Sequence, residues 1–561
     1  MQKKICIAQS VEELKFILEK SGEKILVLPV NLETFLYCVS KNLNFINPKK
    51  IISNDIHKKI LIETDDLIKK IIFSSNLDSN LLHEIQVFLR FRVYSFKFIK
   101  YSIEKILKKE ANIKYFIVSG WSKDTHFNLN EYILSEIIQF LIPKNKIINL
   151  NDKTLKKVDL SKNNIFYEYI EPQLKSYSKK NKILLNNLYY NFKRIIFSNF
   201  SRKNVFFYPT FSKVGAIRRT VFYFFNIKPL FFKKKQTKIK FKNFYSLRKI
   251  SKTYEYKILK LFSNKFENYF IDLYQKNKSI KKLLENNHFD LIAANITKGI
   301  EGAVMCKTKN KQTNSVCIPH GTITNSFNKF DKIYKKNIAQ AVFSGDANYF
   351  SIQSKITKKS LKNIKINGKP ITTGNIVFAS NNNSSKQKIL FAVTLKDFYN
   401  LQFLGVEMFY EFYENLKTFE EISQKNEFKF LVKIHPSEQK CAAQLQSFFK
   451  NLEFTSKKID HALRDAFVTI SYSSTVIEDS LNSSVPVILF DQWNRYQHCE
   501  AERNIQKLNK AIYYVKKKED LAKTLKTVLR SKKIDFKQYI LDKDYNSNIK
   551  KFILPKAELK I

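Results

Sequence analysis

Residues 466–491 read AFVTISYSSTVIEDSLNSSVPVILFD. The apolar run AFVTISY stops at Ser473, a short helical pattern follows, and a second apolar run, VPVILFD, stops at Asp491. Two apolar runs joined by a helical segment indicate a βαβ unit of a parallel sheet. We therefore expect polar side chains at the carboxyl end of a buried strand in this part of the chain.

The same alternation extends along the rest of the chain. Strand-like runs include KILVLPV at 24–30, KYFIVSG at 114–120, VFFYPTF at 205–211, FDLIAANI at 289–296, SVCIPHG at 315–321, KILFAVT at 388–394 and FKFLVKIHP at 428–436. Helical patterns separate many of them, for example at residues 31–43, 129–141 and 404–424. The pattern predicts an α/β protein built on parallel sheets.

A chain of 561 residues is too long for a single core, so at least two domains are expected. We predict an N-terminal half at 1–330, a C-terminal domain at 331–530 and a charged tail at 531–561. The N-terminal half is either one domain or an accessory domain at 1–190 followed by 191–330. Within it, residues 81–110 are expected to form a long basic helix. Two short strands are expected after residue 331, AVFSG at 341–345 and KPITTG at 369–374.

The chain is strongly basic, with 99 Lys and Arg against 50 Asp and Glu and a formal charge of +49. Part of this excess matches the Lys, Asn, Ile, Phe and Tyr bias of an AT-rich genome. The remaining positive field favours phosphate-bearing ligands or an anionic membrane leaflet. Nucleic-acid binding is an alternative, although no RNA-recognition, zinc-finger or helix-turn-helix signature is present and no nucleic-acid partner is expected.

An aromatic run at 216–236, AIRRTVFYFFNIKPLFFKKKQ, is bordered by Arg218, Arg219 and three lysines, Lys233 to Lys235. Aromatic rings flanked by cations suit contact with an anionic inner-membrane surface. A buried strand bordered by solvated lysines explains the same pattern. No signal peptide and no apolar run of about 18 residues is found. We expect a cytoplasmic protein, either free or peripheral on the inner face of the plasma membrane.

The six cysteines form no CxxC pair and no zinc spacing, so neither a disulfide framework nor a structural metal is expected. No DxD-like metal motif occurs where the chemistry would need one. No cofactor is expected.

Four strand ends carry chemistry: His320-Gly321, Gly374-Asn375, His435-Pro436 and Ser473-Ser474. Ligands of open parallel sheets bind at the carboxyl ends of strands. Hydroxyls at a helix start can hold a phosphate, although plain helix capping uses the same residues. A histidine after a strand can stabilise a leaving phosphate or act as a general base, and it can also be purely structural.

Taken together, HGT at 320–322, TGN at 373–375, ILFAVT, KIHP and ISYSSTVIEDSLNSSVPVILFD resemble the C-terminal half of GT-B transferases of surface carbohydrate synthesis. The resemblance is greatest to the CDP-glycerol glycerophosphotransferase and polysialyltransferase-like group, and it covers residues 289–500. It implies two Rossmann-like domains facing a central cleft, with extra N-terminal elements. The order of these short motifs gives the resemblance its specificity.

The resemblance also implies roles for individual residues. It places His435 and the pair Ser473-Ser474 on the donor phosphates and makes His320 a candidate catalytic base. Glu301, in KGIEGAV, is similar to an acidic-Gly motif whose carboxylate serves as a base, but only one acidic residue precedes the glycine here and a helix-start carboxylate is the simpler explanation. The other expected donor-binding residues are Gly321, Gly374, Asn375, Lys433, Thr475 and Asp491.

The expected activity is metal-independent transfer of a sugar or sugar acid from a CMP- or CDP-linked donor to a surface polysaccharide or lipid-linked glycan. The donor would bind the C-terminal domain and the acceptor the N-terminal half. Alternatives are a CDP-glycerol type polyol-phosphate transferase, a basic nucleic-acid-binding protein, and a peripheral membrane scaffold without a working site.

Overall fold

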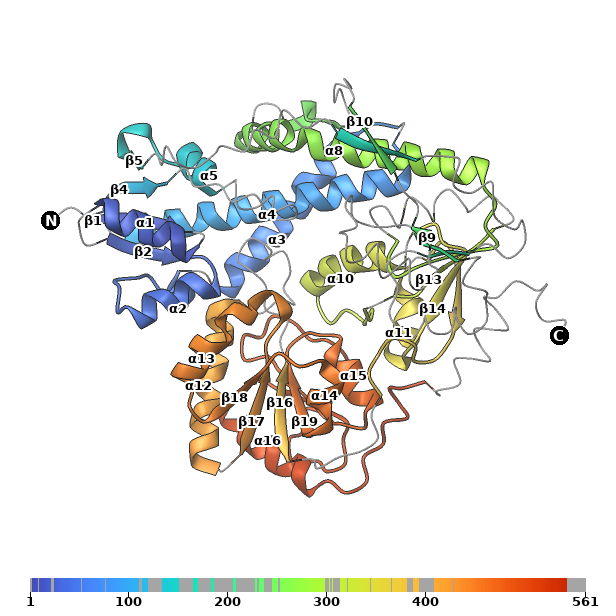
Figure 1. Cartoon of the computed structure of the whole chain (residues 1–561). Helices are drawn as coiled ribbons and strands as arrows, with labels where there is room; N and C mark the ends of the chain where they lie inside the picture. The colour runs from blue at the N-terminus through green and yellow to red at the C-terminus, as the bar shows by residue number, and fades with distance from the viewer. Residues whose placement is uncertain are drawn as a thin grey trace. The chain divides into compact units, whose positions relative to one another are not determined.

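The computed structural model forms two compact units (Figure 1). It describes residues 3–8, 10–21, 25–51, 53–75, 77–109, 113–119, 134–150, 165–169, 183–185, 205–207, 228–229, 232–236, 245–250, 253–297, 302, 305, 313–319, 321–343, 345–364, 366–380, 387–392, 408–426 and 428–541. One unit contains residues 1–67, 90–159 and 380–535, and the other contains 68–89, 160–379 and 536–561.

A six-stranded parallel sheet forms the C-terminal part of the first unit, in the order β18-β17-β16-β19-β20-β21. In chain order this is 3-2-1-4-5-6, the arrangement of a doubly wound Rossmann sheet, whose strand order reverses between β16 and β19. The strands are β16 (Lys388–Ala392), β17 (Lys429–Lys433), β18 (Leu452–Thr455), β19 (Ala466–Ser471), β20 (Val487–Phe490) and β21 (Ile512–Val515).

Helices lie on both sides of this sheet (Figure 1). They are α12 (Phe409–Asn426), α13 (Ala442–Phe448), α14 (Ile459–Arg464), α15 (Val476–Asn482) and α16 (Lys518–Arg530). Because both faces are covered, the strands are almost continuously apolar, and every residue of β20 and β21 is buried. Phe419 of α12 is fully buried and packs its ring against those of Phe391, Phe430 and Phe490 from three strands.

The second unit contains a seven-stranded parallel sheet in the order β15-β14-β13-β12-β7-β8-β9. Its strands are β7 (Ile183–Leu185), β8 (Val205–Phe207), β9 (Lys228–Pro229), β12 (Leu291–Ala294), β13 (Asn314–Cys317), β14 (Tyr349–Ile352) and β15 (Lys369–Thr372). The strand order again reverses, between β7 and β12, so this sheet is also Rossmann-like. The predicted α/β class with two Rossmann-like sheets is confirmed.

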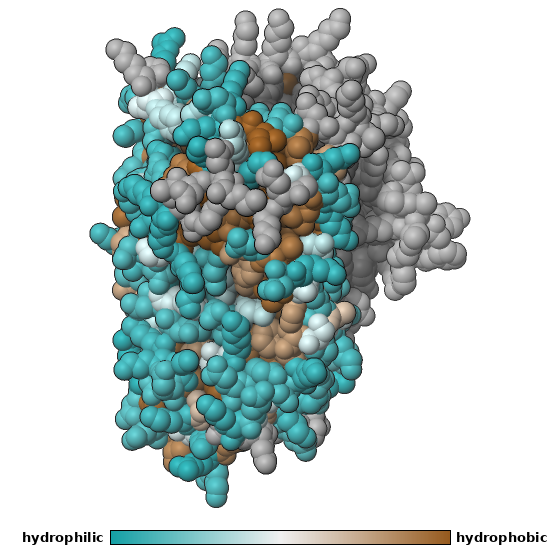
Figure 2. Space-filling model, turned by 90° about the vertical axis from the view of Figure 1, so that its left-hand side faces the viewer, coloured by the Kyte–Doolittle hydropathy of each residue, from teal (hydrophilic) through white to brown (hydrophobic). Residues whose placement is uncertain are grey.

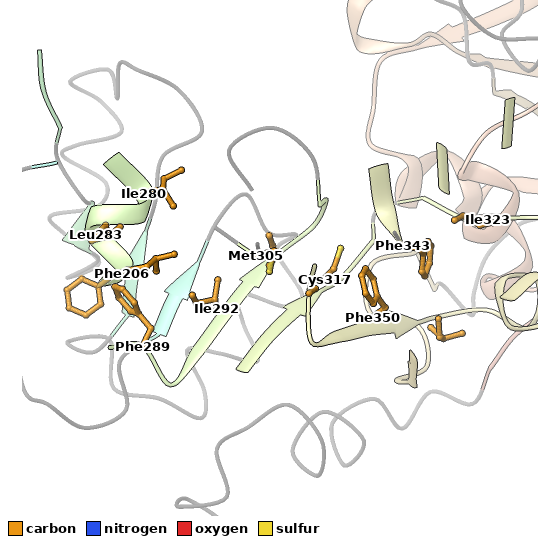
Figure 3. Close-up of a cluster of buried hydrophobic side chains, with 14 of the residues drawn as sticks. Phe206, Ile280, Leu283, Phe289, Ile292, Met305, Cys317, Ile323, Phe343 and Phe350 are labelled. Carbon is orange, nitrogen blue, oxygen red and sulfur yellow. The ribbon is translucent and has the colours of Figure 1, made fainter. Parts of the chain in front are cut away.

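One buried hydrophobic cluster lines the seven-stranded sheet (Figure 3). The rings of Phe206 and Phe289 meet edge to face, and those of Phe343 and Phe350 stack, with centroids 6.0 and 5.9 Å apart. The long helix α8 (Tyr254–Asn286) adds Ile280, Leu283 and Leu284 to this cluster. Leu541 belongs to it as well, so the predicted charged tail is packed as far as residue 541, where Tyr539 also accepts a backbone hydrogen bond from Lys355.

The boundary between the seven-stranded sheet and the C-terminal sheet lies later in the chain than the predicted boundary at residue 331. The segment AVFSG, predicted as a strand, instead holds the end of α10 (Lys329–Val342) and the buried Phe343. The strand lies further on: β14 pairs with β13, and β15 pairs with β14. Residues up to 372 therefore extend the seven-stranded sheet, and the C-terminal sheet begins only with β16.

A third parallel sheet, of four strands in the order β2-β1-β4-β5, lies in the first unit. It consists of β1 (Lys3–Ala8), β2 (Ile25–Pro29), β4 (Ile113–Val118) and β5 (Ile147–Asn149), with the helices α1 (Val11–Ser21), α2 (Leu32–Ser40), α3 (Asn54–Lys70) and α5 (Leu134–Leu141). This N-terminal sheet therefore groups with the C-terminal sheet and not with the seven-stranded one.

The predicted basic helix is α4 (Ser79–Lys109). Two of its cations are paired within the first unit: Arg90 bonds Asp65, and Lys97 lies 2.9 Å from Glu63. These pairs tie α4 to α3.

On the face shown in Figure 2, hydrophilic side chains dominate and hydrophobic ones are exposed in limited patches.

Most of the aromatic run 216–236 lies outside the described residues. Within it, β10 (Phe232–Gln236) pairs antiparallel with β6 (Ile165–Tyr169). In the part of the chain that the structure describes, no helix combines the length and apolarity needed to cross a bilayer.

Candidate functional site

The strand register brings several predicted residues to one edge of the six-stranded sheet. Lys433, the last residue of β17, is paired with Ala392 at the end of β16. On the other side of β16, Phe391 is paired with Ile470, which puts Ala392 level with Ser471, and the Ser471 hydroxyl donates to the Ala392 carbonyl at 3.0 Å. Neighbouring strands lie about 4.8 Å apart, so the Lys433 and Ser471 backbones are about 10 Å apart across the switch point.

Lys433 is a cation at this edge of the sheet. It is half-buried, and burial lowers the pKa of its ammonium group below the usual range. Among the described residues no carboxylate pairs with it. A partly desolvated cation without a counter-ion favours binding of an anion at this point.

His435 follows Lys433 by two residues and is half-buried. Its carbonyl accepts the Glu438 N–H at 2.9 Å, where the 3-10 helix η9 (Pro436–Cys441) begins. Pro436 has no N–H and fits the start of such a turn. The imidazole is therefore carried on the segment that leaves β17 at the same edge as the lysine.

Ser473, Ser474 and Thr475 leave β19 at this edge too. Ser473 is buried, whereas Ser474 and Thr475 are half-buried. The Ser474 hydroxyl accepts the Val476 N–H at 3.3 Å, which is the local capping role that the sequence left open. Thr475 is the N-cap of α15, yet its side chain makes no capping hydrogen bond. A hydroxyl that does not cap remains available to a ligand.

Asp491 ends β20 and organises the loop that follows. Its carboxylate accepts the N–H groups of Arg495 and Tyr496 and the hydroxyl of Tyr514, the last at 2.8 Å. Burial raises the pKa of Asp491 to about 6, against the opposing effect of these bonds. The contacts that the structure gives this carboxylate are thus internal and hold the loop closed.

Other expected site residues lie on the seven-stranded sheet or outside the described residues. Gly374 follows β15 with a φ of 76°, a left-handed conformation that favours glycine. Asn375 bonds the backbone of Phe378 through both its Oδ1 and Nδ2 atoms, at 2.9 and 3.0 Å. The TGN segment is therefore a turn that closes β15.

Gly321 follows β13, and a Cβ added there would meet no atom within 4 Å. His320 and Glu301 lie outside the described residues. The structure thus groups Lys433, His435, Ser473, Ser474, Thr475 and Asp491 on one sheet. The predicted domain at 331–530 would place Gly374 and Asn375 with them, and this is wrong, because β15 pairs within the other sheet. Gly321, from the predicted N-terminal half, follows β13 of that same other sheet.

A buried pair near the serines was not predicted as functional. Glu478 of α15 lies with its Oε1 3.4 Å from His498 Nε2, and both side chains are buried. Its Oε2 is buried and has no hydrogen-bond partner among the described residues. The sequence signal was the acidic pair Glu478-Asp479 within this helix, in which every residue from Ile477 to Asn482 is buried.

Metal ligands do not gather anywhere in the described ranges, where no group of three His, Cys, Asp or Glu side chains could hold an ion. The described cysteines are all buried: Cys6, Cys38, Cys317, Cys441 and Cys499. Burial raises the pKa of Cys38 to about 12, and that of Cys6 still further. These two thiols are poor nucleophiles at neutral pH.

No family model and no curated protein matches the chain. Solved structures with a partial likeness include UDP-GlcNAc 2-epimerase from Methanocaldococcus jannaschii, at 13% identity and a TM-score of 0.37, covering 66% of this chain and 98% of that one. The wall teichoic acid polymerase TagF gives 10% identity and a TM-score of 0.32, covering 66% and 83%. TarM from S. aureus gives 14% identity and a TM-score of 0.30, covering 52% of this chain and 57% of that one. At these values the residues of the sheet edge, and not a relative, are the basis for assigning a function.

Proposed function

We propose that this protein is a GT-B type transferase that binds a nucleotide-activated donor at the carboxyl edge of its six-stranded sheet. The observation that carries the proposal is the half-buried Lys433, which has no anionic partner among the described residues and stands beside a switch point lined by hydroxyls. In doubly wound sheets this is the position at which nucleotides bind.

The chemistry follows from charge. Lys433 and His435 would face the donor phosphates, and Ser473, Ser474 and Thr475 would donate hydrogen bonds to them. As the bond to the transferred group breaks, negative charge grows on the departing phosphate. Fixed cationic and hydroxyl groups stabilise that charge more than the ground state and so lower the barrier.

The acceptor belongs, in this proposal, to the seven-stranded sheet. His320 is the proposed base for an acceptor hydroxyl, with Glu301 as the alternative. Gly321 would allow close approach of a ligand, because an added Cβ meets nothing within 4 Å. The transferred group is a sugar or sugar acid, the donor is CMP- or CDP-linked, and the acceptor is a surface polysaccharide or lipid-linked glycan at the inner membrane face.

Calorimetric titration with CMP-, CDP-, UDP- and GDP-linked donors tests the donor site. We expect one nucleotide class to bind and Lys433→Ala to abolish most of that binding. Lys429→Ala is the matched control, because Lys429 begins the same strand at its opposite end and is exposed. Failure of every donor to bind, or equal binding by the two variants, would contradict the proposal.

Transfer of polyol phosphate from CDP-polyols is the second candidate, since the same phosphate contacts would hold that donor. Product analysis separates the two: a glycosidic product supports sugar transfer, and a phosphodiester product supports polyol-phosphate transfer. The formal charge of +49 keeps nucleic-acid binding as a third candidate. It predicts affinity for RNA or DNA that falls steeply with salt.

A further inference from the structure

Tyr472 is the residue immediately before the proposed phosphate-binding turn, Ser473 to Thr475. Its side chain is buried, and its hydroxyl accepts a hydrogen bond from Arg495 Nε at 3.2 Å. The Arg495 guanidinium also lies over the Tyr472 ring, 5.6 Å from the centroid. Arg495 therefore fixes both the position of the ring and the direction of its hydroxyl.

The same guanidinium is held from its other side by Glu411. Its two terminal nitrogens donate to the two carboxylate oxygens at 2.7 and 2.6 Å, a bidentate pair that is almost completely buried. Glu411 lies in the first turn of α12 and also accepts the Met408 N–H at 3.0 Å. One arginine thus joins the segment after β19, the loop after β20 and the start of α12.

Side chains of two helices in the N-terminal part lie within reach of the Arg495 charge. His57 of α3 lies with Nδ1 3.1 Å from the Tyr94 hydroxyl of α4, and both side chains are buried. Burial, with a smaller effect from the Arg495 charge, holds the pKa of His57 well below its usual range. Arg495 is therefore a buried cation near the rings of Tyr472 and His57, with Glu411 as its bidentate ion-pair partner.

Stability alone is a poor explanation for this arrangement. Desolvating a carboxylate and a guanidinium costs about as much as their attraction returns, and apolar residues of similar volume often replace such pairs without loss. The arrangement instead gives geometric definition, because a planar guanidinium can satisfy a carboxylate and a tyrosine at fixed angles, which a lysine cannot.

We infer that Arg495 is a positioning residue for the turn Ser473 to Thr475 and acts on it through Tyr472. The inference rests on the proposed donor site for its functional meaning. The effect of Arg495 on the order of this turn can be measured without any ligand.

The test is the double variant Arg495→Met with Glu411→Leu, which removes both charges and keeps most of the volume. Hydrogen exchange of the amides of residues 472–477 is measured in the nucleotide-free protein, and CDP affinity is measured by calorimetry. We expect exchange to become about 10-fold faster and CDP binding about 10-fold weaker, the size of one lost hydrogen bond, while the unfolding midpoint changes little. Arg503→Met is the control, because Arg503 lies in the same loop as Arg495 but stacks on Tyr514 of β21 and donates to Gln497.

Unchanged exchange at 472–477 in the double variant would overturn the inference, as would the same change in the Arg503 control. Faster exchange in a protein whose wild type binds no nucleotide would uphold the positioning role and reject the donor site. If the double variant does not fold, Tyr472→Phe takes its place, since it removes only the hydroxyl. A smaller increase in exchange at the same amides then supports the inference, and no increase rejects it.

Discussion

The ring of Phe35, in α2, meets the ring of Tyr413, in α12, edge to face with centroids 5.1 Å apart. The centroid of the Phe35 ring also lies 5.6 Å from that of Phe409. Lys49 Nζ lies 3.7 Å from Glu414 Oε2. These contacts join helices that flank the N-terminal sheet to a helix that covers the C-terminal sheet. Residues 1–67 therefore pack against the helix that covers the proposed donor sheet. This packing explains why the N-terminal and C-terminal sheets belong to one compact unit.

Phe35→Ala is expected to lower the free energy of unfolding of this unit by about 3–5 kcal/mol, because Phe35 is 3% exposed and its removal leaves a cavity. Urea unfolding measures the loss, and hydrogen exchange locates it. Protection should fall in both β1 and β16. Phe327→Ala, at an exposed position, should change little. A loss confined to the N-terminal strands would contradict joint packing.

Lys433 should give donor binding a pH dependence. Its ammonium form binds phosphate, and burial has lowered its pKa, so affinity for CDP should decrease as the pH rises through that lowered value, earlier than for an ordinary lysine. Lys433→Arg keeps its charge and should bind CDP evenly from about pH 7.5 to about 10. Calorimetry across this range is the measurement. Parallel profiles for the two proteins would show that Lys433 does not contact the phosphates.

Ser473→Ala and Ser474→Ala should each weaken CDP binding by about 10-fold or more, because hydrogen bonds to charged groups are worth about 1.5–3 kcal/mol. Ser447→Ala is the control, since Ser447 is exposed on α13 and bonds only the Gln444 carbonyl among the described residues. Wild-type affinity in both site variants would refute the phosphate role of the turn.

Gly374→Ala should destabilise the second unit by about 1–2 kcal/mol, because a Cβ is strained at a φ of 76°. CDP affinity should not change, since Gly374 closes β15 of the seven-stranded sheet. Gly321→Ala provides the comparison: its new Cβ meets no atom within 4 Å, and stability should be kept. Loss of CDP binding with unchanged stability in the Gly374 variant would return this residue to the donor site.

Asp491 should make stability depend on pH with a defined sign. Its pKa in the folded protein is raised to about 6 from 3.8, so the native state holds its proton more tightly. The stabilisation of the protonated form is present below about pH 4 and is lost as the pH rises to about 6, a decrease of about 3 kcal/mol. Asp491→Asn lacks this titration. Urea unfolding of both proteins at several pH values should show their difference changing only in that window, and a constant difference would contradict it.

The sequence by itself determined the parallel α/β architecture and the ends of the strands that carry His435 and Ser473. The periodicity of apolar residues and the polar residues that end each apolar run are local properties. They located β16, β17, β19 and β20 within a few residues. The sequence did not determine which sheet accepts β14 and β15, because strand pairing is a non-local choice. For the same reason it missed the grouping of the N-terminal sheet with the C-terminal one.

Only the tertiary structure decided the electrostatics of the proposed site. Lys433 has a lowered pKa because folding removes water from its surroundings, and no spacing along the chain encodes that loss. Arg495, Glu411 and Tyr472 come from separate segments and meet only when β16, β19 and β20 are assembled side by side. Desolvation and long-range contact are properties of the packed chain, and so they could be read only from its fold.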